Sequence, residues 1–364
     1  MNKDSITPKP KFRTRIRGWI QKHPTATYAL AGTGLILIAS IVTLALLYQR
    51  PVEVTPLPPI TKKPVPEVVY YSPLTGVKVA DEAATKQSVT AIMIENSPDA
   101  RPQSGIKQAG IVYEAIAEGG ITRFLTLHQE DKPTLIGPVR SLRMYFVDWL
   151  APYDASIAHV GGSAAALREV RNGNYRDIDQ FFNADTYWRS TDRYAPHNVY
   201  TNFKRLDALN KAKKFTSSEF TGFSRVDGKA ADKPTTTSIA INFSGPLFNT
   251  TYKYNQKTNT YARSQGGAPH KDREKGTITP SVVIAMHVDM HLVNEDGYRE
   301  AIKTTGSGKA TLFQNGTATN VTWTKTKRSA PLQFTDADGK DVPLVRGQTW
   351  IAAVPNGSGS ITWQ

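Results

Sequence analysis

An uncharged apolar stretch at residues 27–48 constrains this chain more than any other feature of its sequence. About 22 helical residues, rising ~1.5 Å each, cover ~33 Å and can cross a hydrocarbon core of ~30 Å. Residues 1–23 carry seven basic side chains and one acidic side chain. The positive-inside rule therefore predicts a basic cytoplasmic tail (1–26), a transmembrane anchor (27–48) and an extracytoplasmic remainder.

A cleaved signal peptide is the alternative interpretation of this stretch. Its charged head and apolar run would both be unusually long, and the following YQRPVEV lacks a small-x-small cleavage site. The sequence therefore favours an uncleaved signal-anchor and a single-pass membrane protein of the cell envelope.

The composition excludes several kinds of chemistry. The chain has no cysteine, which excludes disulfides, thiolate metal sites, a cysteine nucleophile and a lipid-modified cysteine. The formal net charge is +14, and most of this excess lies outside the tail. Such an excess favours an anionic envelope polymer or a cell-wall protein as partner, although a generally basic proteome would give the same balance. No nucleic-acid-binding motif is present, so we expect no nucleic acid.

The residue patterning after the anchor predicts an α+β fold class. Residues 49–69 form a proline-rich linker, since residues 51–66 alone contain six prolines. Mixed strand and helix patterns predict a mixed α/β domain over residues 70–214. A polar linker (215–238) follows. Short strands with turn signals then predict a mostly-β domain over residues 239–364.

Local signals predict particular elements within these two domains. Two apolar runs, residues 111–118 and 122–129, read as a β-hairpin, and Asn315-Gly316 marks another. Ser141 is a candidate N-cap for a helix that reaches about residue 150. A second helix should follow Gly161-Gly162-Ser163, and a third should occupy residues 203–214.

Several longer motifs resemble one known family. The motifs are YSPLTG, IENSPDARPQSG, AGIVYEAIAEGGITRF, IGPVRSLR, HVGGS and RYAPHNVYT, with DADGKDVPLVRGQTWI near the C-terminus. Together they resemble the YerB-like lipoprotein family, over roughly residues 70–355. The resemblance implies a two-domain exported protein of the bacterial envelope and a domain of unknown function, without implying a reaction. Family members commonly carry a lipid-modified cysteine, which this chain lacks.

Basic residues around Gly137-Pro138 suggest an anion site. Arg140 and Arg143 flank Ser141, where a helix start would add free N–H groups and a positive dipole end. Planar guanidinium groups match phosphates or carboxylates. The predicted ligand-binding residues are Arg123, Arg140, Ser141, Arg143, Arg193 and His197. The alternative is that Ser141 only caps a helix and that the arginines pair with Glu114, Glu118 or Asp148.

Four residues are candidates for catalysis: Glu114, Glu118, His159 and His197. The two glutamates lie four apart in a predicted strand and should share one partly apolar face, where acid–base chemistry is feasible. Salt-bridged structural carboxylates are the alternative. Acyl transfer would need a histidine, an aspartate and a serine, and no G-x-S-x-G elbow supports it.

Three alternating residues, His287, Asp289 and His291, are weak candidates for a metal site. Strand periodicity places them on one face, but successive side chains on a flat strand rarely converge on one ion. A solvated strand face is the main alternative, and we expect no cofactor.

The hypothesis that best fits these patterns is a membrane-anchored extracytoplasmic protein that binds an anionic ligand or partner. One alternative is an envelope hydrolase or transferase that uses Glu114 and Glu118 on a glycan or phosphorylated substrate. Another is a pure protein-interaction module.

Overall fold

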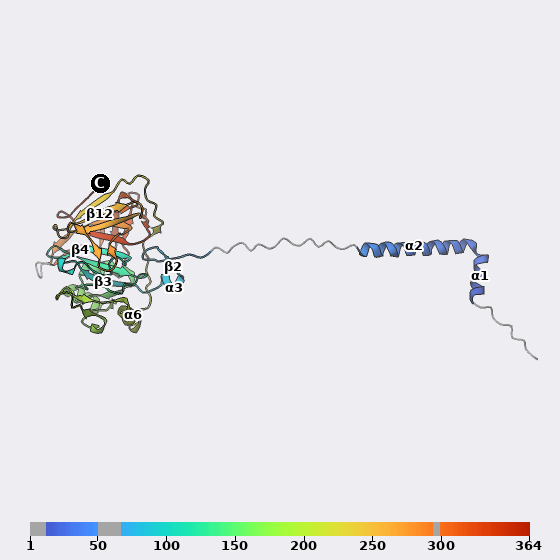
Figure 1. The fold of residues 1–364 in the computed structure, drawn as a ribbon, viewed down its shortest axis with the longest axis horizontal. Helices are drawn as coiled ribbons and strands as arrows, with labels where there is room; N and C mark the ends of the chain where they lie inside the picture. Colours follow the sequence, from blue (N-terminus) through green and yellow to red (C-terminus); the bar gives the residue numbers. More distant parts are fainter. Residues whose placement is uncertain (1–11, 50–66, 294–298) are drawn as a thin grey trace, which may run out of the picture. The chain divides into compact units, whose positions relative to one another are not determined.

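A computed structural model describes residues 12–49, 67–293 and 299–364. It divides into a first unit of residues 1–67 and a second of residues 68–364 (Figure 1). The first unit contains α1 (Phe12–Lys22) and α2 (Pro24–Tyr48). α2 confirms the predicted apolar helix and meets the length and hydropathy expected of a membrane span. It begins three residues early because Pro24 suits the first turn, where no N–H is needed.

The second unit is built on one ten-stranded mixed sheet. In sheet order its strands are β22 (Gln333–Thr335), β21 (Thr317–Lys325), β20 (Gly306–Gln314), β17 (Val282–Val288), β24 (Thr349–Pro355), β4 (Ile111–Glu118), β5 (Ile121–His128), β3 (Thr90–Glu95), β6 (Ser156–Ala158) and β7 (Arg176–Asp177). The strands β3 and β24 are buried at every residue. Near-continuous apolar strands of this kind belong at the centre of a sheet that is covered on both faces.

The strand β24 joins the two sequence segments that we expected to be separate domains. It lies parallel to β17 on one side and to β4 on the other. The first segment therefore supplies one half of the sheet and the second segment supplies the other half. The predicted boundary at residues 215–238 divides the chain but does not divide the hydrophobic core.

One face of the ten-stranded sheet packs against a five-stranded sheet. Its strands, in order, are β14 (Ala268–Pro269), β13 (Thr260–Gln265), β12 (Thr250–Asn255), β11 (Ser238–Asn242) and β25 (Ser360–Trp363). Tyr252 and Tyr261 of this sheet share a buried cluster with Phe124 and Trp350 of the large sheet. Figure 1 shows β12 beside the central strands.

Three helices pack on the large sheet. They are α4 (Met144–Leu150), α5 (Ala164–Asn172) and α6 (Phe203–Ala212). The short helix α3 (Glu82–Thr85) has no buried residue and lies against β1 (Tyr70–Tyr71) and β2 (Lys78–Val79). Phe146 and Trp149 of α4 and Val170 of α5 pack on the face opposite the five-stranded sheet, whereas α6 joins the first face through Phe203 and Leu206. Short 3₁₀ turns are η1 (Pro98–Ala100), η2 (Ala151–Tyr153) and η3 (Ala184–Thr186).

Paired short strands complete the second unit. They are β1 (Tyr70–Tyr71) with β2 (Lys78–Val79), β8 (Trp188–Arg189) with β9 (Val199–Tyr200), β10 (Arg225–Val226) with β23 (Leu344–Val345), β15 (Lys271–Asp272) with β16 (Gly276–Thr277), and β18 (Met290–Leu292) with β19 (Glu300–Ile302). β10 falls inside the predicted linker, so that segment packs against the core.

The local predictions were mostly right. The hairpin β4–β5 turns at Gly119-Gly120, and β20–β21 turns at Asn315-Gly316, whose positive φ values of 58° and 77° suit a tight hairpin turn. The helices α5 and α6 occupy their predicted places, and the side chain of Ser163 caps α5.

The predicted helix start at Ser141 is wrong. Val139 and Leu142 instead form bridges with Ile94 and Gly162, which hold this segment extended. Arg143 keeps an extended conformation, with φ −125° and ψ 153°, and α4 begins only at Met144. The backbone pairing therefore outweighs the capping signal, and Ser141 lies before any free helical N–H groups.

Candidate functional site: the pocket beside His197

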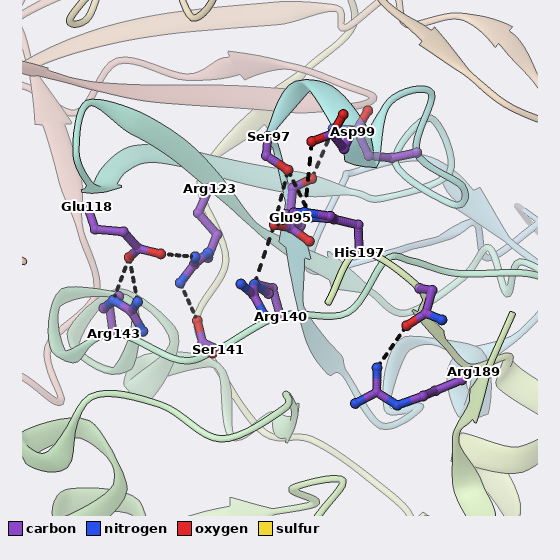
Figure 2. Close-up of polar contacts among 12 residues, drawn as sticks. Glu95, Ser97, Asp99, Glu118, Arg123, Arg140, Ser141, Arg143, Arg189 and His197 are labelled. Atoms are coloured by element: carbon purple, nitrogen blue, oxygen red, sulfur yellow. Dashed lines mark hydrogen bonds and ion pairs between the residues drawn. The ribbon is translucent and has the colours of Figure 1, made fainter. Parts of the chain in front are cut away.

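Five polar residues gather where β3 ends and its loop begins. Glu95 ends β3, Ser97 and Asp99 follow in the loop, and Arg140 and His197 come from two other segments (Figure 2). We call these five residues the Glu95 cluster. The Glu95 Oε1 lies 2.9 Å from His197 Nδ1 and 3.4 Å from Arg140 Nε. The hydroxyl of Ser97 donates to the same carboxylate oxygen at 3.1 Å.

The Glu95 cluster opens on one side into a surface pocket of about 760 Å³. The pocket is lined by Asp99, Arg101, Pro102, Asp192, Arg193, Tyr194, Ala195, His197 and Arg273. His197 belongs to both features, since its imidazole contacts the buried Glu95 while 23% of its side chain stays exposed. The pocket lies where the loop after β3 meets the loop between β8 and β9, and the β15–β16 turn adds Arg273.

Two arginines of the pocket are held by neutral acceptors. Arg193 donates to the backbone carbonyls of Asp99 at 2.7 Å and Pro102 at 2.6 Å. Arg101 donates to the carbonyl and the side-chain oxygen of Asn96. Within the described residues, no ion pair within 4.0 Å joins either guanidinium to a carboxylate. Both guanidiniums therefore lack a direct ion pair with a described carboxylate, although the buried Glu114 carboxylate attracts Arg101 from a greater distance.

The electrostatics of Arg101 agree with this arrangement. Burial and the nearby charge of Arg263 lower the pKa of the Arg101 guanidinium from its ordinary value. A lowered pKa means that the protein environment disfavours this positive charge. An anion in the pocket would relieve that cost. The third arginine of the pocket differs, because Arg273 pairs with Asp192 at 2.6 Å.

The predicted anion site at Arg143 is filled by a carboxylate of the protein itself. Glu118 accepts from Arg123 Nη2 at 2.6 Å and from two nitrogens of Arg143 (Figure 2). Burial raises the pKa of Glu118, but the attraction of Arg123 and Arg143 outweighs burial and lowers it overall. The carbonyl of Ser141 accepts from Arg123 Nη1 at 2.9 Å. These contacts match the structural alternative that the sequence left open.

Glu114 and Glu118 do not share a face of the sheet. The pairing of β4 with β5 slips between Ile116 and Glu118, which inserts one extra residue and reverses the alternation. Glu114 points toward Trp350 on the face that packs against the five-stranded sheet, whereas Glu118 joins Arg143 on the other face. The predicted carboxylate pair is therefore wrong, because strand periodicity fails at a bulge.

Glu114 belongs to a buried polar network that joins the two sequence segments. Its carboxylate lies 2.7 Å from Arg263 Nη2 and accepts from Trp350 Nε1 at 2.9 Å and Thr122 Oγ1 at 3.0 Å. Glu114 and Arg263 are both 0% exposed. Arg263 also contacts His270, whose pKa burial and the neighbouring arginines lower well below its ordinary value. A carboxylate enclosed in this way cannot touch a substrate.

His159 is also enclosed. Its Nε2 lies 2.9 Å from Asp177 and its Nδ1 lies 2.7 Å from the carbonyl of Gly161, and the ring is fully buried. Asp179 holds the same turn by accepting from the Gly161 N–H and from Arg171. This network fixes the strand-to-helix turn before α5, and it engages both ring nitrogens of His159, so neither is positioned to accept a proton from a nucleophile.

The three weak metal candidates do not converge. His287 lies in β17, Asp289 falls between strands and accepts from Asn356, and His291 lies in β18. Over the described part of the chain, no group of three or more potential metal-ligating side chains is arranged around a common point.

Part of the candidate site lies outside the residues predicted from the sequence. Arg140, Arg193 and His197 were among the predicted ligand-binding residues, but Glu95, Arg101 and Asp192 were not. The available signal was the loop IENSPDARPQSG, which follows a buried strand and carries several charged residues. That signal was read as a family motif rather than as a site.

Comparisons with known proteins connect these motifs to one family. Residues 74–216 match a model described as "Protein of unknown function (DUF3048) N-terminal domain", and residues 239–351 match the corresponding C-terminal domain. A Bacillus subtilis (strain 168) protein named "Putative lipoprotein YerB" is 33% identical over 291 residues, which cover 78% of this chain and 86% of that protein. This chain belongs to the YerB-like family. The family thus confirms the resemblance that the sequence motifs suggested.

A solved structure of a family member supports the fold. The crystal structure of YerB from Bacillus subtilis matches with a TM-score of 0.72 and 30% identity, covering 80% of this chain and 99% of that one. The two family models also divide the YerB-like chain near residues 216 and 239, where the sequence patterning changed.

Proposed function

We propose that this YerB-like chain is a single-pass, extracytoplasmic envelope protein that binds an anionic ligand in the pocket beside His197. The ligand class is a phosphate- or carboxylate-bearing group of an envelope polymer or of a cell-wall protein. The observation that carries the proposal is the pair Arg101 and Arg193, whose charges face the pocket and are bonded to neutral oxygens only.

The anchor part of the proposal rests on α2. This helix is apolar over 25 residues, and no described residue of it is buried within the protein. The relative named as a lipoprotein fits membrane association, and this chain has no cysteine to carry a lipid. We therefore propose that α2 takes the place of a lipid anchor, with the basic tail in the cytoplasm and the second unit outside.

The hydrolase or transferase alternative gains little from the geometry. Glu114 is enclosed by Arg263 and Trp350. Glu118 is held ionised by two arginines, which suits neither a general acid nor a base poised near neutral pH. Binding is therefore the function that the arrangement of charges supports best.

Calorimetric titration of the detergent-solubilised full chain tests the ligand proposal, with inorganic phosphate and a glycerol phosphate oligomer as probes. Arg193→Gln should weaken binding by about tenfold or more, because charge-assisted hydrogen bonds contribute about 1.5–3 kcal/mol each. Arg168→Gln is the matched control, since Arg168 is exposed on α5 and lies outside the pocket. Equal affinity of Arg193→Gln and the native chain for both probes would refute an anion site here.

Protease treatment of intact protoplasts tests the orientation. The proposal expects cleavage of the second unit from outside while the N-terminal tail stays protected. A protected C-terminal epitope would reverse the proposed topology without bearing on the pocket.

A further inference from the structure

The short helix α1 carries an apolar stripe that is exposed among the described residues 12–49 of the first unit. Phe12, Ile16, Trp19 and Ile20 follow the spacing i, i+4, i+7 and i+8, which places them on one face about 100° wide. Their exposed fractions are 77%, 44%, 45% and 41%, and α1 has no buried residue. The free energy of the system falls when apolar surface of this extent moves from water into an apolar phase.

Cationic side chains border this stripe on both sides. At 100° per residue, Arg13 lies next to Ile20 on one edge and Arg15 lies next to Trp19 on the other. Arg17 and Lys22 lie further round, and the helix contains no acidic residue. Long cationic side chains in these positions can extend to phosphate groups while their stems stay against apolar surface.

The connection to α2 fixes where this helix must lie. Only His23 separates the two helices, and its φ of −134° and ψ of 63° end the first helix before Pro24 begins the second. The His23 N–H still donates to the Trp19 carbonyl at 3.0 Å. If α2 crosses the bilayer, α1 is held at the bilayer surface, within reach of the headgroups. A lipid surface is therefore the partner whose geometry and charge fit the stripe.

We propose that α1 is an interfacial helix that binds anionic phospholipid in the cytoplasmic leaflet. Its apolar stripe faces the acyl chains, and its arginines contact lipid phosphates. This inference rests on the proposed membrane span α2 and its orientation, and it is independent of the pocket beside His197. It gives the tail a lipid-binding role in addition to setting topology.

Because the chain has no native cysteine, a single introduced cysteine can be labelled selectively. Single substitutions Ile16→Cys and Ile20→Cys place a nitroxide label on the stripe, whereas Thr14→Cys and Gln21→Cys place it on the opposite face. Leu37→Cys labels the middle of α2 and reports the span separately. The full chain is reconstituted into vesicles of phosphatidylcholine, alone or mixed with phosphatidylglycerol. Label contact with oxygen and with a water-soluble nickel chelate is then measured.

The proposal expects the labels at 16 and 20 to contact oxygen and avoid the chelate, with the reverse at 14 and 21. This contrast should be larger with phosphatidylglycerol present. The triple variant Arg13→Gln, Arg15→Gln, Arg17→Gln should give the same contrast in both lipid mixtures.

Equal chelate contact at all four positions, with a protected label at 37, overturns the interfacial helix alone. A chelate-accessible label at 37 overturns the span and this inference together, whatever the pocket binds. An equal contrast for the native arginines in both mixtures overturns the anionic preference.

Discussion

Two groups of arginines in the second unit differ in the partners that their guanidinium groups bond to. Arg123 and Arg143 converge on Glu118, and all three side chains are largely buried. Arg101 and Arg193 bond to carbonyl and amide oxygens and border an open pocket. In the first group the protein supplies the anion, whereas in the second group the proposed anion would come from outside the chain. The number of arginines in a sequence segment therefore says less about a candidate binding site than the partner of each guanidinium does.

The extreme case of the closed arrangement is the pair Glu114 and Arg263, which is fully buried. The substitution Glu114→Gln leaves the Arg263 guanidinium buried without a carboxylate. The free energy of unfolding should fall by about 3–5 kcal/mol, as for other broken buried pairs. Urea denaturation of the detergent-solubilised chain measures this change. A loss below about 1 kcal/mol would mean that the buried pair of Glu114 and Arg263 contributes little to the stability of the fold.

A smaller loss is expected at Glu118, which is 21% exposed. Glu118→Gln should lower the free energy of unfolding by about 2–3 kcal/mol near neutral pH, because two buried arginines lose their anion. The pKa of Glu118 is lowered in the folded protein, so its contribution is present above the unfolded carboxyl pKa of about 4.3 and is lost as pH falls through the lower folded value. Native and variant stabilities should therefore converge in acid. A stability difference between the native and Glu118→Gln proteins that stays constant down to low pH would contradict the lowered pKa of Glu118.

Arg140 is intermediate between the two groups. Its Nε lies 3.4 Å from Glu95 and the side chain is 27% exposed. Arg140→Gln should cost about 1 kcal/mol, since Glu95 keeps its contacts with Ser97 and His197. Asp99→Asn is the reference variant for stability. It should change the free energy of unfolding very little, because the Asp99 side chain is 80% exposed and its carboxylate lies 3.9 Å from His197 Nε2. If Arg140→Gln costs as much as Glu118→Gln, then Arg140 belongs with the closed group.

The smallest effect on stability should come from the open group. Arg101→Gln should change the free energy of unfolding by less than about 1 kcal/mol, because the lost hydrogen bonds are offset by relief of a disfavoured charge. The same variant should weaken binding of the phosphate probes by about tenfold. If Arg101→Gln instead lowers stability and leaves phosphate affinity unchanged, then Arg101 is a structural residue like Arg123 and Arg143.

The sequence predicted more of the fold than of the site, for physical reasons. Hairpins at Gly119-Gly120 and Asn315-Gly316 depend on local turn chemistry, and α5 depends on the cap at Ser163, so neighbouring residues suffice to predict them. Ser141 has the same local signal, but bridges from Val139 and Leu142 to distant segments decide its conformation.

The site depends on contacts between residues far apart in the chain. The face that Glu118 occupies follows from one bulge, which alternation cannot foresee. The partners of Arg143 and Arg193 lie 25 and about 91–94 residues away, respectively. Arg193 and His197 were predicted as neighbours of an anion site at Ser141, and the structure places both in the lining of the pocket beside His197. Arg101 was not among the predicted ligand-binding residues, because the sequence does not show that its guanidinium bonds to the oxygens of Asn96 rather than to a carboxylate.

The central position of β24 imposes an order on biogenesis. Glu114 of β4 and Trp350 of β24 are 236 residues apart, yet they share a hydrogen bond at the middle of the sheet. A chain exported from its N-terminus would deliver β4 to the far side of the membrane long before its neighbour arrives. Until then the edge of β4 would present unpaired N–H and C=O groups, which invite pairing with other chains. If the second unit is exported as proposed, translocation of β24 must therefore precede aggregation, and a C-terminal truncation that removes β24 should leave a product that never completes its sheet.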